Sequence, residues 1–152
     1  MNQFLSDIAS ELVVGVLAII ATALWHRWRS LDGKIGRGLM KVSPNRRAVI
    51  TEADDGEIYI TDRRGTRNLT KSPAIDRDSL WSPNSRWIAF MSQRSGDWDV
   101  YVVSAESGRI SRLTTGKGSA RPLQWNKSGD LIIDLGGSQL LVWNHEIEKR
   151  LK

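Results

Sequence analysis

The chain has 152 residues, a formal net charge of +5 and no cysteine. This length corresponds to about one domain, and the lack of cysteine excludes disulfide frameworks, thiolate nucleophiles and thiolate zinc sites. With only two histidines, a metal site would need mostly carboxylate ligands, so we expect neither a metal nor a cofactor. The excess of Lys and Arg (22) over Asp and Glu (17) suggests an anionic partner, whose nature depends on where the charge lies.

An uncharged apolar run, LVVGVLAIIATALW, occupies residues 12–25. Widened to residues 8–28, it would form about 31 Å of helix, enough to cross a hydrocarbon core of ~30 Å. We therefore predict one transmembrane helix within an N-terminal anchor, residues 1–29. An interfacial or buried helix and a cleaved signal peptide are alternatives, although no basic residue precedes the run as a signal requires. The expected membrane-interface residues are Trp25, Arg27, Trp28 and Arg29.

The charges on the two sides of the apolar run are asymmetric. Two acidic residues and no basic ones precede it, whereas residues 27–47 hold seven basic side chains against one acidic, a balance of +6. Residues 48–152 hold 15 basic and 14 acidic side chains, a balance of +1. The positive-inside rule then predicts a single-pass inner-membrane protein with its amino terminus outside and its C-terminal domain in the cytoplasm. The basic, Gly-rich residues 30–38 read as a juxtamembrane linker that either contacts anionic lipid or serves only as a topology signal.

Three copies of one short unit follow the linker. In each copy we expect an apolar segment, a turn, an apolar strand, a glycine turn, a second strand and a closing strand, and we find almost no helical pattern after Leu31. The starts are Val42-Ser43-Pro44-Asn45, Trp81-Ser82-Pro83-Asn84 and the degraded Trp125-Asn126-Lys127-Ser128. The closing strands are expected to end at residues 68–70, 112–114 and 150–152.

Four short antiparallel strands at a spacing of about 40 residues are typical of a propeller blade. We therefore predict an all-β soluble domain of three four-stranded propeller-like blades, preceded by the transmembrane helix. The domain should cover residues 39–152, with blades at about 39–80, 80–121 and 122–152.

The middle copy, WSPNSRWIAFMSQRSGDWDVYVV at residues 81–103, resembles the TolB-type WD-like propeller repeat. The resemblance lies in the Trp-Ser-Pro start, the Ile-Ala-Phe strand, the Ser/Arg/Gly turn and the Asp-Val-Tyr strand, and it extends more weakly over the other two copies. It implies a propeller fold and, by analogy, a binding role. Propellers of this family usually close with about six or more blades, often in the periplasm or beside a hydrolase, so three blades on a cytoplasmic side depart from the pattern.

Three blades alone would leave sheet edges and apolar faces uncovered. A two-fold dimer that closes a six-bladed ring is the simplest symmetric solution, with a sheet sandwich or a higher cyclic oligomer as alternatives. Trp81 and Trp125 hold equivalent positions, so we expect both to pack between blades. Trp98, between two aspartates after a glycine turn, either packs or belongs to an exposed binding surface.

Catalysis finds little support, because neither His26 nor His145 has a nucleophile beside it in the sequence. The acidic segments 54–57 and 76–78 lack the spacing of a calcium loop and read as solvated turns. The segment 116–121 has two glycines and two basic side chains that could cradle phosphate, or it is a plain inter-blade loop. The candidate ligand-binding residues are Arg63, Arg64, Arg67, Arg94, Trp98, Lys117 and Arg121.

We therefore expect a non-enzymatic, membrane-anchored binding module whose cytoplasmic domain forms a homo-oligomer, with a dimer favoured, and recognises a protein partner. The first alternative is a membrane sensor or effector that binds a small anion such as a nucleotide or cyclic nucleotide. A truncated TolB-like envelope protein in the periplasm is the second. Besides itself and its partner or ligand, the protein is expected to contact the lipid bilayer, but no nucleic acid duplex, because the repeats are nearly neutral.

Overall fold

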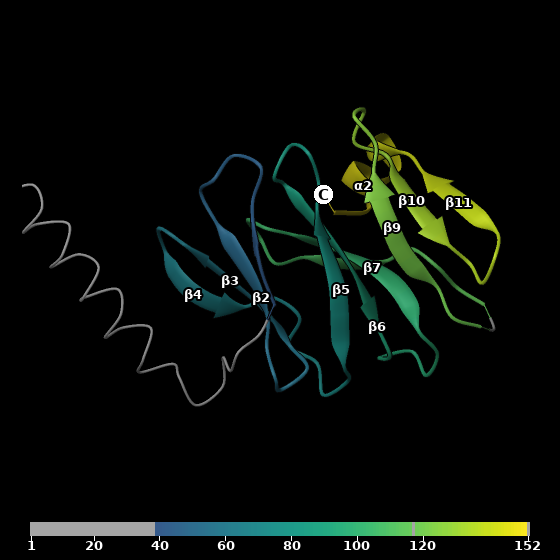
Figure 1. The fold of residues 1–152 in the computed structure, drawn as a ribbon, viewed down its shortest axis with the longest axis horizontal. Helices are drawn as coiled ribbons and strands as arrows, with labels where there is room; N and C mark the ends of the chain where they lie inside the picture. The colour runs from purple at the N-terminus through teal and green to yellow at the C-terminus, as the bar shows by residue number, and fades with distance from the viewer. Residues whose placement is uncertain (1–38, 117, 152) are drawn as a thin grey trace, which may run out of the picture. The chain divides into compact units, whose positions relative to one another are not determined.

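The computed structural model describes residues 39–116 and 118–151, which form three antiparallel sheets and one helix (Figure 1). The predicted transmembrane helix, the basic linker and the four membrane-interface residues lie outside the described residues. Within the part of the chain that is described, no helix is long and apolar enough to span a membrane.

Blade 1 is a four-stranded sheet in the order β1-β2-β3-β4. Its strands are β1 (Leu39–Val42), β2 (Val49–Glu52), β3 (Ile58–Asp62) and β4 (Gly65–Asn68). Alternation along β2 and β3 turns Ile50, Ile58 and Ile60 into the core, where each is at most 1% exposed. The blade therefore buries one face, and that face lies against blade 2.

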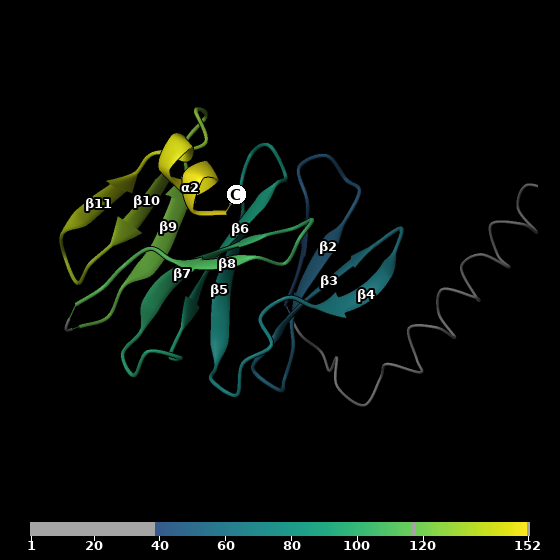
Figure 2. The same cartoon turned by 180° about the vertical axis from the view of Figure 1, so that it is seen from behind.

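Blade 2 has the same strand order, β5-β6-β7-β8. Its strands are β5 (Asp76–Trp81), β6 (Trp87–Ser92), β7 (Asp99–Ser104) and β8 (Ile110–Arg112). Every residue of β6 and β7 is buried, as expected for near-continuous apolar strands that are covered on both faces. Blade 2 accordingly lies between blade 1 and blade 3 (Figures 1 and 2).

Blade 3 has three strands, in the order β11-β10-β9. They are β9 (Arg121–Trp125), β10 (Leu131–Asp134) and β11 (Gln139–Val142), and helix α2 (Asn144–Leu151) follows them. The predicted closing strand at residues 150–152 is therefore wrong, as is the expectation of almost no helix after Leu31. The segment NHEIEKRL buries Ile147 and Leu151, four residues apart as on one helix face, and its charges suit a helix dipole, with Glu146 in the first turn and basic residues in the last.

The turn after the first strand of each blade is held by side chains. In blade 1, the Ser43 hydroxyl donates to Asn45 Oδ1 (2.8 Å) and accepts the Ala48 N–H (3.0 Å). In blade 2, Ser82 makes the same two bonds, to Asn84 (2.7 Å) and from Trp87 (2.9 Å). These bonds fix the start of the second strand, which explains the repeated Ser-Pro-Asn of the sequence.

Blade 3 replaces this serine turn with an asparagine–aspartate pair. Asn126 Nδ2 donates to Asp130 Oδ2 (2.9 Å), and the Asp130 N–H donates to Asn126 Oδ1 (2.9 Å). Asp130 Oδ1 also accepts the N–H of Asn144 at the start of α2 (2.9 Å). The third copy can therefore lose its serine and proline, because this pair holds both the turn and the helix start.

A threonine closes blades 1 and 2 in the same way. The Thr70 hydroxyl accepts the Ile58 N–H (3.0 Å) and donates to Glu57 Oε2 (2.5 Å). The Thr114 hydroxyl accepts the Val100 N–H (2.9 Å) and donates to Asp99 Oδ1 (2.8 Å). We call these two sets of bonds the threonine staples. Each fixes the segment after the outermost strand to the start of the third strand.

The two contacts between blades have separate apolar cores. We call the contact between blades 1 and 2 the first joint and that between blades 2 and 3 the second joint. The first joint buries Ile50, Ile58, Ile60, Leu69, Ile88, Phe90, Tyr101 and Val103. The second buries Trp87, Ala89, Val100, Val102, Leu113, Ala120, Leu131, Ile133, Ile147 and Leu151.

An indole crosses each joint. Trp81 Nε1 donates to the Lys41 carbonyl of blade 1 (3.0 Å), and Trp125 Nε1 donates to the Leu80 carbonyl of blade 2 (3.2 Å). Both rings are partly buried and pack against the joint cores. The predicted inter-blade packing of the two tryptophans is confirmed, and the indole N–H adds a hydrogen bond to it.

Candidate functional site

A groove of about 640 Å³ opens between blades 1 and 2. The turns β1–β2, β3–β4, β5–β6 and β7–β8 border it, so four loops from two blades meet there. Its apolar lining comes from Ala48, Ile60, Trp81 and Ala105. Its charged lining comes from Arg47, Arg63, Arg64, Arg86, Asp62 and Glu106. We call this site the inter-blade groove.

Asp62 is already neutralised by its neighbours. It accepts Arg64 at 3.1 Å and Arg67 at 2.9 Å. Burial alone would raise its pKa, but the hydrogen bonds from the two arginines lower the pKa of Asp62 to about 2. The carboxylate is therefore ionised at neutral pH, and its charge is compensated by Arg64 and Arg67 in the groove wall.

Two arginines of the groove have no carboxylate of their own. Among residues 39–116 and 118–151, no carboxylate oxygen lies within 4.0 Å of the Arg47 or Arg63 guanidinium, and both residues are exposed. Arg86, in contrast, pairs with Glu148 of α2 at 3.2 Å and lies over the Trp87 ring. The groove thus combines an apolar floor with two cations available to an incoming anion.

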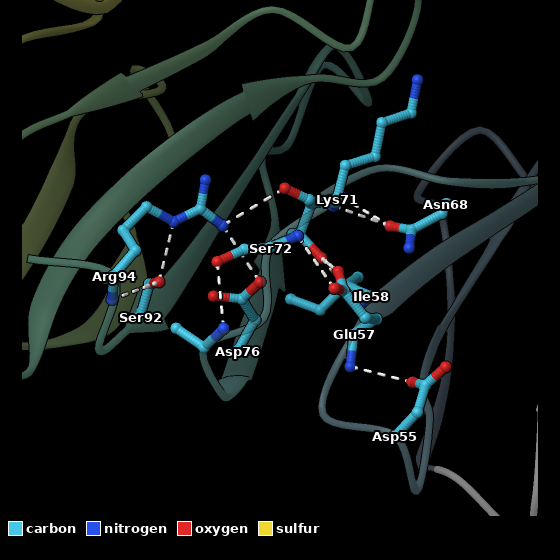
Figure 3. A network of polar contacts seen from close by, with 11 residues as sticks. Asp55, Glu57, Ile58, Asn68, Lys71, Ser72, Asp76, Ser92 and Arg94 are labelled. Carbon is cyan, nitrogen blue, oxygen red and sulfur yellow. Dashed lines mark hydrogen bonds and ion pairs between the residues drawn. The ribbon is translucent and has the colours of Figure 1, made fainter.

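Arg94, one of the predicted ligand-binding residues, lies in a polar network of the first joint (Figure 3). It bonds to Asp76 Oδ2 at 3.0 Å, to Ser92 Oγ at 2.8 Å and to the Thr70 carbonyl of blade 1 at 3.4 Å. The Asp76 side chain is fully buried, and this burial raises the pKa of Asp76 although Arg94 is adjacent. Arg94 therefore connects two blades, and the structure does not bring it to the inter-blade groove.

The other predicted ligand-binding residues are dispersed. Arg63 and Arg64 line the inter-blade groove, and Arg67 donates to Asp62 and to the Ala105 carbonyl at its edge. Trp98 is half-buried beneath the Arg77 guanidinium, which lies 4.1 Å from its ring centroid. Arg121 pairs with Asp134 at 3.2 Å on blade 3. Lys117 lies outside the described residues.

Sequence reasoning missed Arg47 and Arg86 as groove residues. The missed signal was the repeat itself, because both arginines follow the asparagine of a Ser-Pro-Asn turn by two residues. They therefore occupy equivalent places in neighbouring blades. The second histidine, His145, is exposed on α2 with Glu146 at 3.5 Å. Within the described ranges, no group of three or more His, Asp or Glu side chains is placed to hold a metal ion.

Three comparisons with known proteins bear on these blades. The chain is 36% identical over 78 residues to the uncharacterized peptidase YuxL of Bacillus subtilis (strain 168), covering 50% of this chain and 12% of that protein. It is 41% identical over 54 residues to the Tol-Pal system protein TolB of Syntrophus aciditrophicus (strain SB), covering 36% of this chain and 12% of that protein. The crystal structure of TolB from Acinetobacter baumannii superposes with a TM-score of 0.51 and 25% identity, over 69% of this chain and 29% of that one.

The chain spans about an eighth of the length of the two relatives it matches in sequence. The superposed part of the solved structure is likewise only 29% of that chain. The model of the TolB beta propeller domain matches residues 41–148, and the three sheets cover the same stretch. The chain therefore belongs to the TolB beta propeller family, as a partial propeller of three blades.

Proposed function

We propose that this chain is a non-enzymatic binding module, in which the partial propeller completes itself with a second copy and recognises a protein partner. The observation that carries the proposal is the distribution of exposed apolar side chains. Within residues 39–116 and 118–151, blade 2 has both faces covered, whereas blades 1 and 3 each have one face covered by a neighbouring blade. The free faces are where association would bury apolar surface.

Exposed apolar side chains gather on the two outer blades. On blade 1 these are Leu39, Met40 and Val42, which are 60%, 48% and 61% exposed. On and around blade 3 they are Leu135, Leu140, Leu141 and Trp143, between 37% and 53% exposed. By strand register, Met40 and Val42 lie on the free face of blade 1 and Leu141 on the free face of blade 3. A two-fold dimer would place the free face of blade 3 against that of the partner's blade 1, twice, and would cover these side chains.

We call the contact between blade 3 and the partner's blade 1 the closing joint. It would lack the indole hydrogen bond that the first and second joints have. In each joint the accepting carbonyl belongs to the residue before the indole position of the preceding blade, Lys41 or Leu80. The next carbonyl in this series is that of Gln124, on β9. The residue of blade 1 that would face it is Val42, which holds the place of Trp81 in the strand register and cannot donate. The closing joint would therefore have one hydrogen bond fewer than the first and second joints, and we expect it to be less stable than they are.

The membrane anchor and its orientation remain part of the proposal, and only the sequence supports them. The apolar residues 8–28 and the balance of +6 that follows favour an anchored module with a cytoplasmic propeller. A reporter enzyme fused after the last residue, active in only one compartment, tests the side of the membrane. A periplasmic result would favour the envelope-protein alternative.

Dimer formation is tested by sedimentation of the detergent-extracted full chain. We expect a monomer–dimer equilibrium that Leu141→Glu weakens at least tenfold and that Val42→Trp tightens about fivefold, because an indole could then reach the Gln124 carbonyl. Ile75→Glu is the matched control, since Ile75 is 52% exposed but lies in the β4–β5 connection. A monomer at every concentration, or an equal effect of the control, would exclude the dimer.

The sensor alternative has one observation in its favour, namely that Arg63 and Arg64 line a groove with two further arginines. Thermal unfolding of the full chain with nucleotides and cyclic nucleotides tests it. An increase in Tm that depends on Arg63 would favour a small-anion sensor over a protein-binding module.

A further inference from the structure

At the second joint, a helix fills the position where the first joint has the inter-blade groove. The strand registers make Val49 of β2 equivalent to Ile88 of β6, because each pairs with the last residue of the blade's first strand. Arg47 and Ala48 of blade 1 then correspond to Arg86 and Trp87 of blade 2. The serine turns agree, since the hydroxyls accept the N–H groups of Ala48 and Trp87 respectively. What surrounds Arg86 therefore shows what can surround Arg47.

Helix α2 is the occupant at the second joint. Ile147 and Leu151 are 0% and 6% exposed and lie in one core with Trp87. Glu148, one residue after Ile147, places its carboxylate 3.2 Å from the Arg86 guanidinium. An amphipathic helix with two Glu, one Lys and one Arg thus covers this joint with an apolar face and an ion pair together.

The first joint has the same elements on the receiving side and a smaller residue at the centre. Ala48 stands where Trp87 stands in the next blade, which leaves the space of an indole open in the groove. Arg47 stands where Arg86 stands, and among the described residues it has no carboxylate within 4.0 Å. Arg63, on the β3–β4 turn, adds a second cation.

Four other charged side chains line the groove, namely Asp62, Arg64, Arg86 and Glu106. Asp62 is neutralised by Arg64 and Arg67, and Arg86 by Glu148. Glu106, on the β7–β8 turn, is exposed and opposes an anion at the blade 2 rim. Among the described residues, the attractive charges that remain are those of Arg47 and Arg63 and one net positive charge of the Arg64–Arg67–Asp62 cluster, all on blade 1, so an incoming carboxylate is favoured on that side.

We propose that the inter-blade groove binds an amphipathic helix of a partner protein that has a carboxylate beside its apolar face, with this carboxylate at Arg47 and Arg63 and an apolar side chain over Ala48 and Ile60. This inference rests on the proposed protein-binding function and specifies the partner's chemistry. It is independent of ring closure, because the groove lies between two blades of the same chain. An amphipathic helix would cover the apolar floor of the groove and pair with its arginines, whereas a phosphate would pair with the arginines alone.

The probe is an acetylated, amidated peptide that copies residues 144–151, NHEIEKRL. Its helix is fixed by a staple between positions 145 and 149, which are one turn apart and exposed in α2, because so short a peptide is otherwise marginally helical. Calorimetric titration into the full chain in detergent should give saturable binding. Replacing both peptide glutamates by glutamine should weaken it at least tenfold.

Three variants of the full chain locate the bound peptide. Arg47→Glu should weaken binding at least tenfold, and Ala48→Trp should abolish it by filling the floor. Arg46→Glu is the matched control with the same change in charge on an exposed neighbour outside the groove lining, and it should leave binding within twofold. Circular dichroism establishes that each variant is folded.

The outcomes separate the possibilities. No saturable binding by the peptide, or equal losses for Arg46→Glu and Arg47→Glu, would overturn the proposal. Binding of inorganic phosphate or ATP that Arg47→Glu removes, without peptide binding, would replace it with a small-anion site. Dimerisation is measured separately by sedimentation, so a dimer that ignores the peptide would refute this inference while leaving the proposed assembly intact.

Discussion

The first and second joints have the same strand arrangement but differ in the side chains that connect the blades. Next to the first joint, Lys41 Nζ of blade 1 donates to Glu52 of the same blade (2.6 Å) and to the Ser79 carbonyl of blade 2 (2.7 Å), and the Ser79 N–H donates to Glu52 (2.8 Å), so hydrogen bonds join this ion pair to the neighbouring blade. At the second joint the strand registers place Leu80 and Met91 at the positions of that lysine and glutamate. At these two positions, therefore, the first joint adds directional bonds to its apolar core, whereas the second joint has apolar side chains.

The two joints also differ in side-chain chemistry at two further places. The buried Asp76–Arg94 pair lies at the first joint. In blade 3 the position of Asp76 is held by Ala120, which packs in the apolar core of the second joint. Outermost, the first joint has Ala48 and an open groove where the second has Trp87 beneath α2. The comparison teaches that a repeat can keep its strands and still have one joint that a helix of the same chain covers and another that is open as a groove.

The largest effect is expected from Trp87→Ala, which empties the centre of the second joint. Trp87 is 5% exposed, and its loss should cost about 3–4 kcal/mol of unfolding free energy. Urea unfolding followed by circular dichroism measures it. Trp87→Phe is the control: because Nε1 has no hydrogen-bond partner among the described residues, a phenyl ring should cost under about 1 kcal/mol. Equal losses would mean that a phenyl ring cannot replace the packing of the larger indole at this position.

Arg94→Met tests the buried pair of the first joint. Removing the guanidinium leaves the Asp76 carboxylate buried without its cation, which should cost about 3 kcal/mol in the same urea assay. The double variant Asp76→Asn with Arg94→Met should recover more than half of this loss, since no buried charge remains. A double variant as unstable as the single one would show that Arg94 acts through its other bonds.

Glu52→Gln should cost about 1–2 kcal/mol at pH 7, because Glu52 accepts bonds from Lys41 and Ser79. Burial alone would raise its pKa, but the hydrogen bonds from Lys41 and Ser79 hold the pKa of Glu52 below its usual 4.5. The folded state thus binds the proton less tightly than the unfolded state. The contribution of the carboxylate is present above pH 4.5 and is lost as the pH falls through the folded pKa.

The measurement is urea unfolding of the wild type and Glu52→Gln at several pH values. The difference between them should be constant from pH 7 to pH 5 and shrink below that. No such dependence is expected when Leu80→Ala is compared with the wild type at the second joint, because that site carries no charge. A difference that grows on acidification would contradict the assigned sign.

The smallest effect is expected from Ala48→Trp, which converts the centre of the first joint into that of the second. An indole in the inter-blade groove should stabilise the fold by about 1 kcal/mol, as cavity-filling substitutions commonly do. Ala74→Trp, at a half-buried position outside the groove, is the control and should give no gain. Destabilisation by Ala48→Trp alone would mean that the groove is too narrow for an aromatic ring.

The blade pattern was predictable from the sequence because it is local. The Ser-Pro-Asn starts, the glycine turns and the alternating strands are set by side chains within a few residues, and blades 1 and 2 formed as expected. The inter-blade place of Trp81 and Trp125 followed from their equivalence in the repeat.

The helix and the groove were not predictable in the same way. Residues 144–151 contain only two apolar side chains, Ile147 and Leu151, too few to establish a helical period. Their burial against blade 2, which stabilises the helix, is a long-range contact. The groove depends on Ala48 being small where its repeat partner is large, which matters only once two blades lie side by side. Arg94 was assigned to a ligand because sequence cannot show that Asp76 is buried beside it.

The threonine staples and serine turns have a consequence for the order of folding. They join residues at most 15 positions apart, so the loops that close them are short and their entropic cost is low. Blades 1 and 2 can each form soon after synthesis. The second joint differs, because its core includes Ile147 and Leu151 from the last described element. Trp87 and its neighbours therefore remain accessible to chaperones until α2 has emerged and packed.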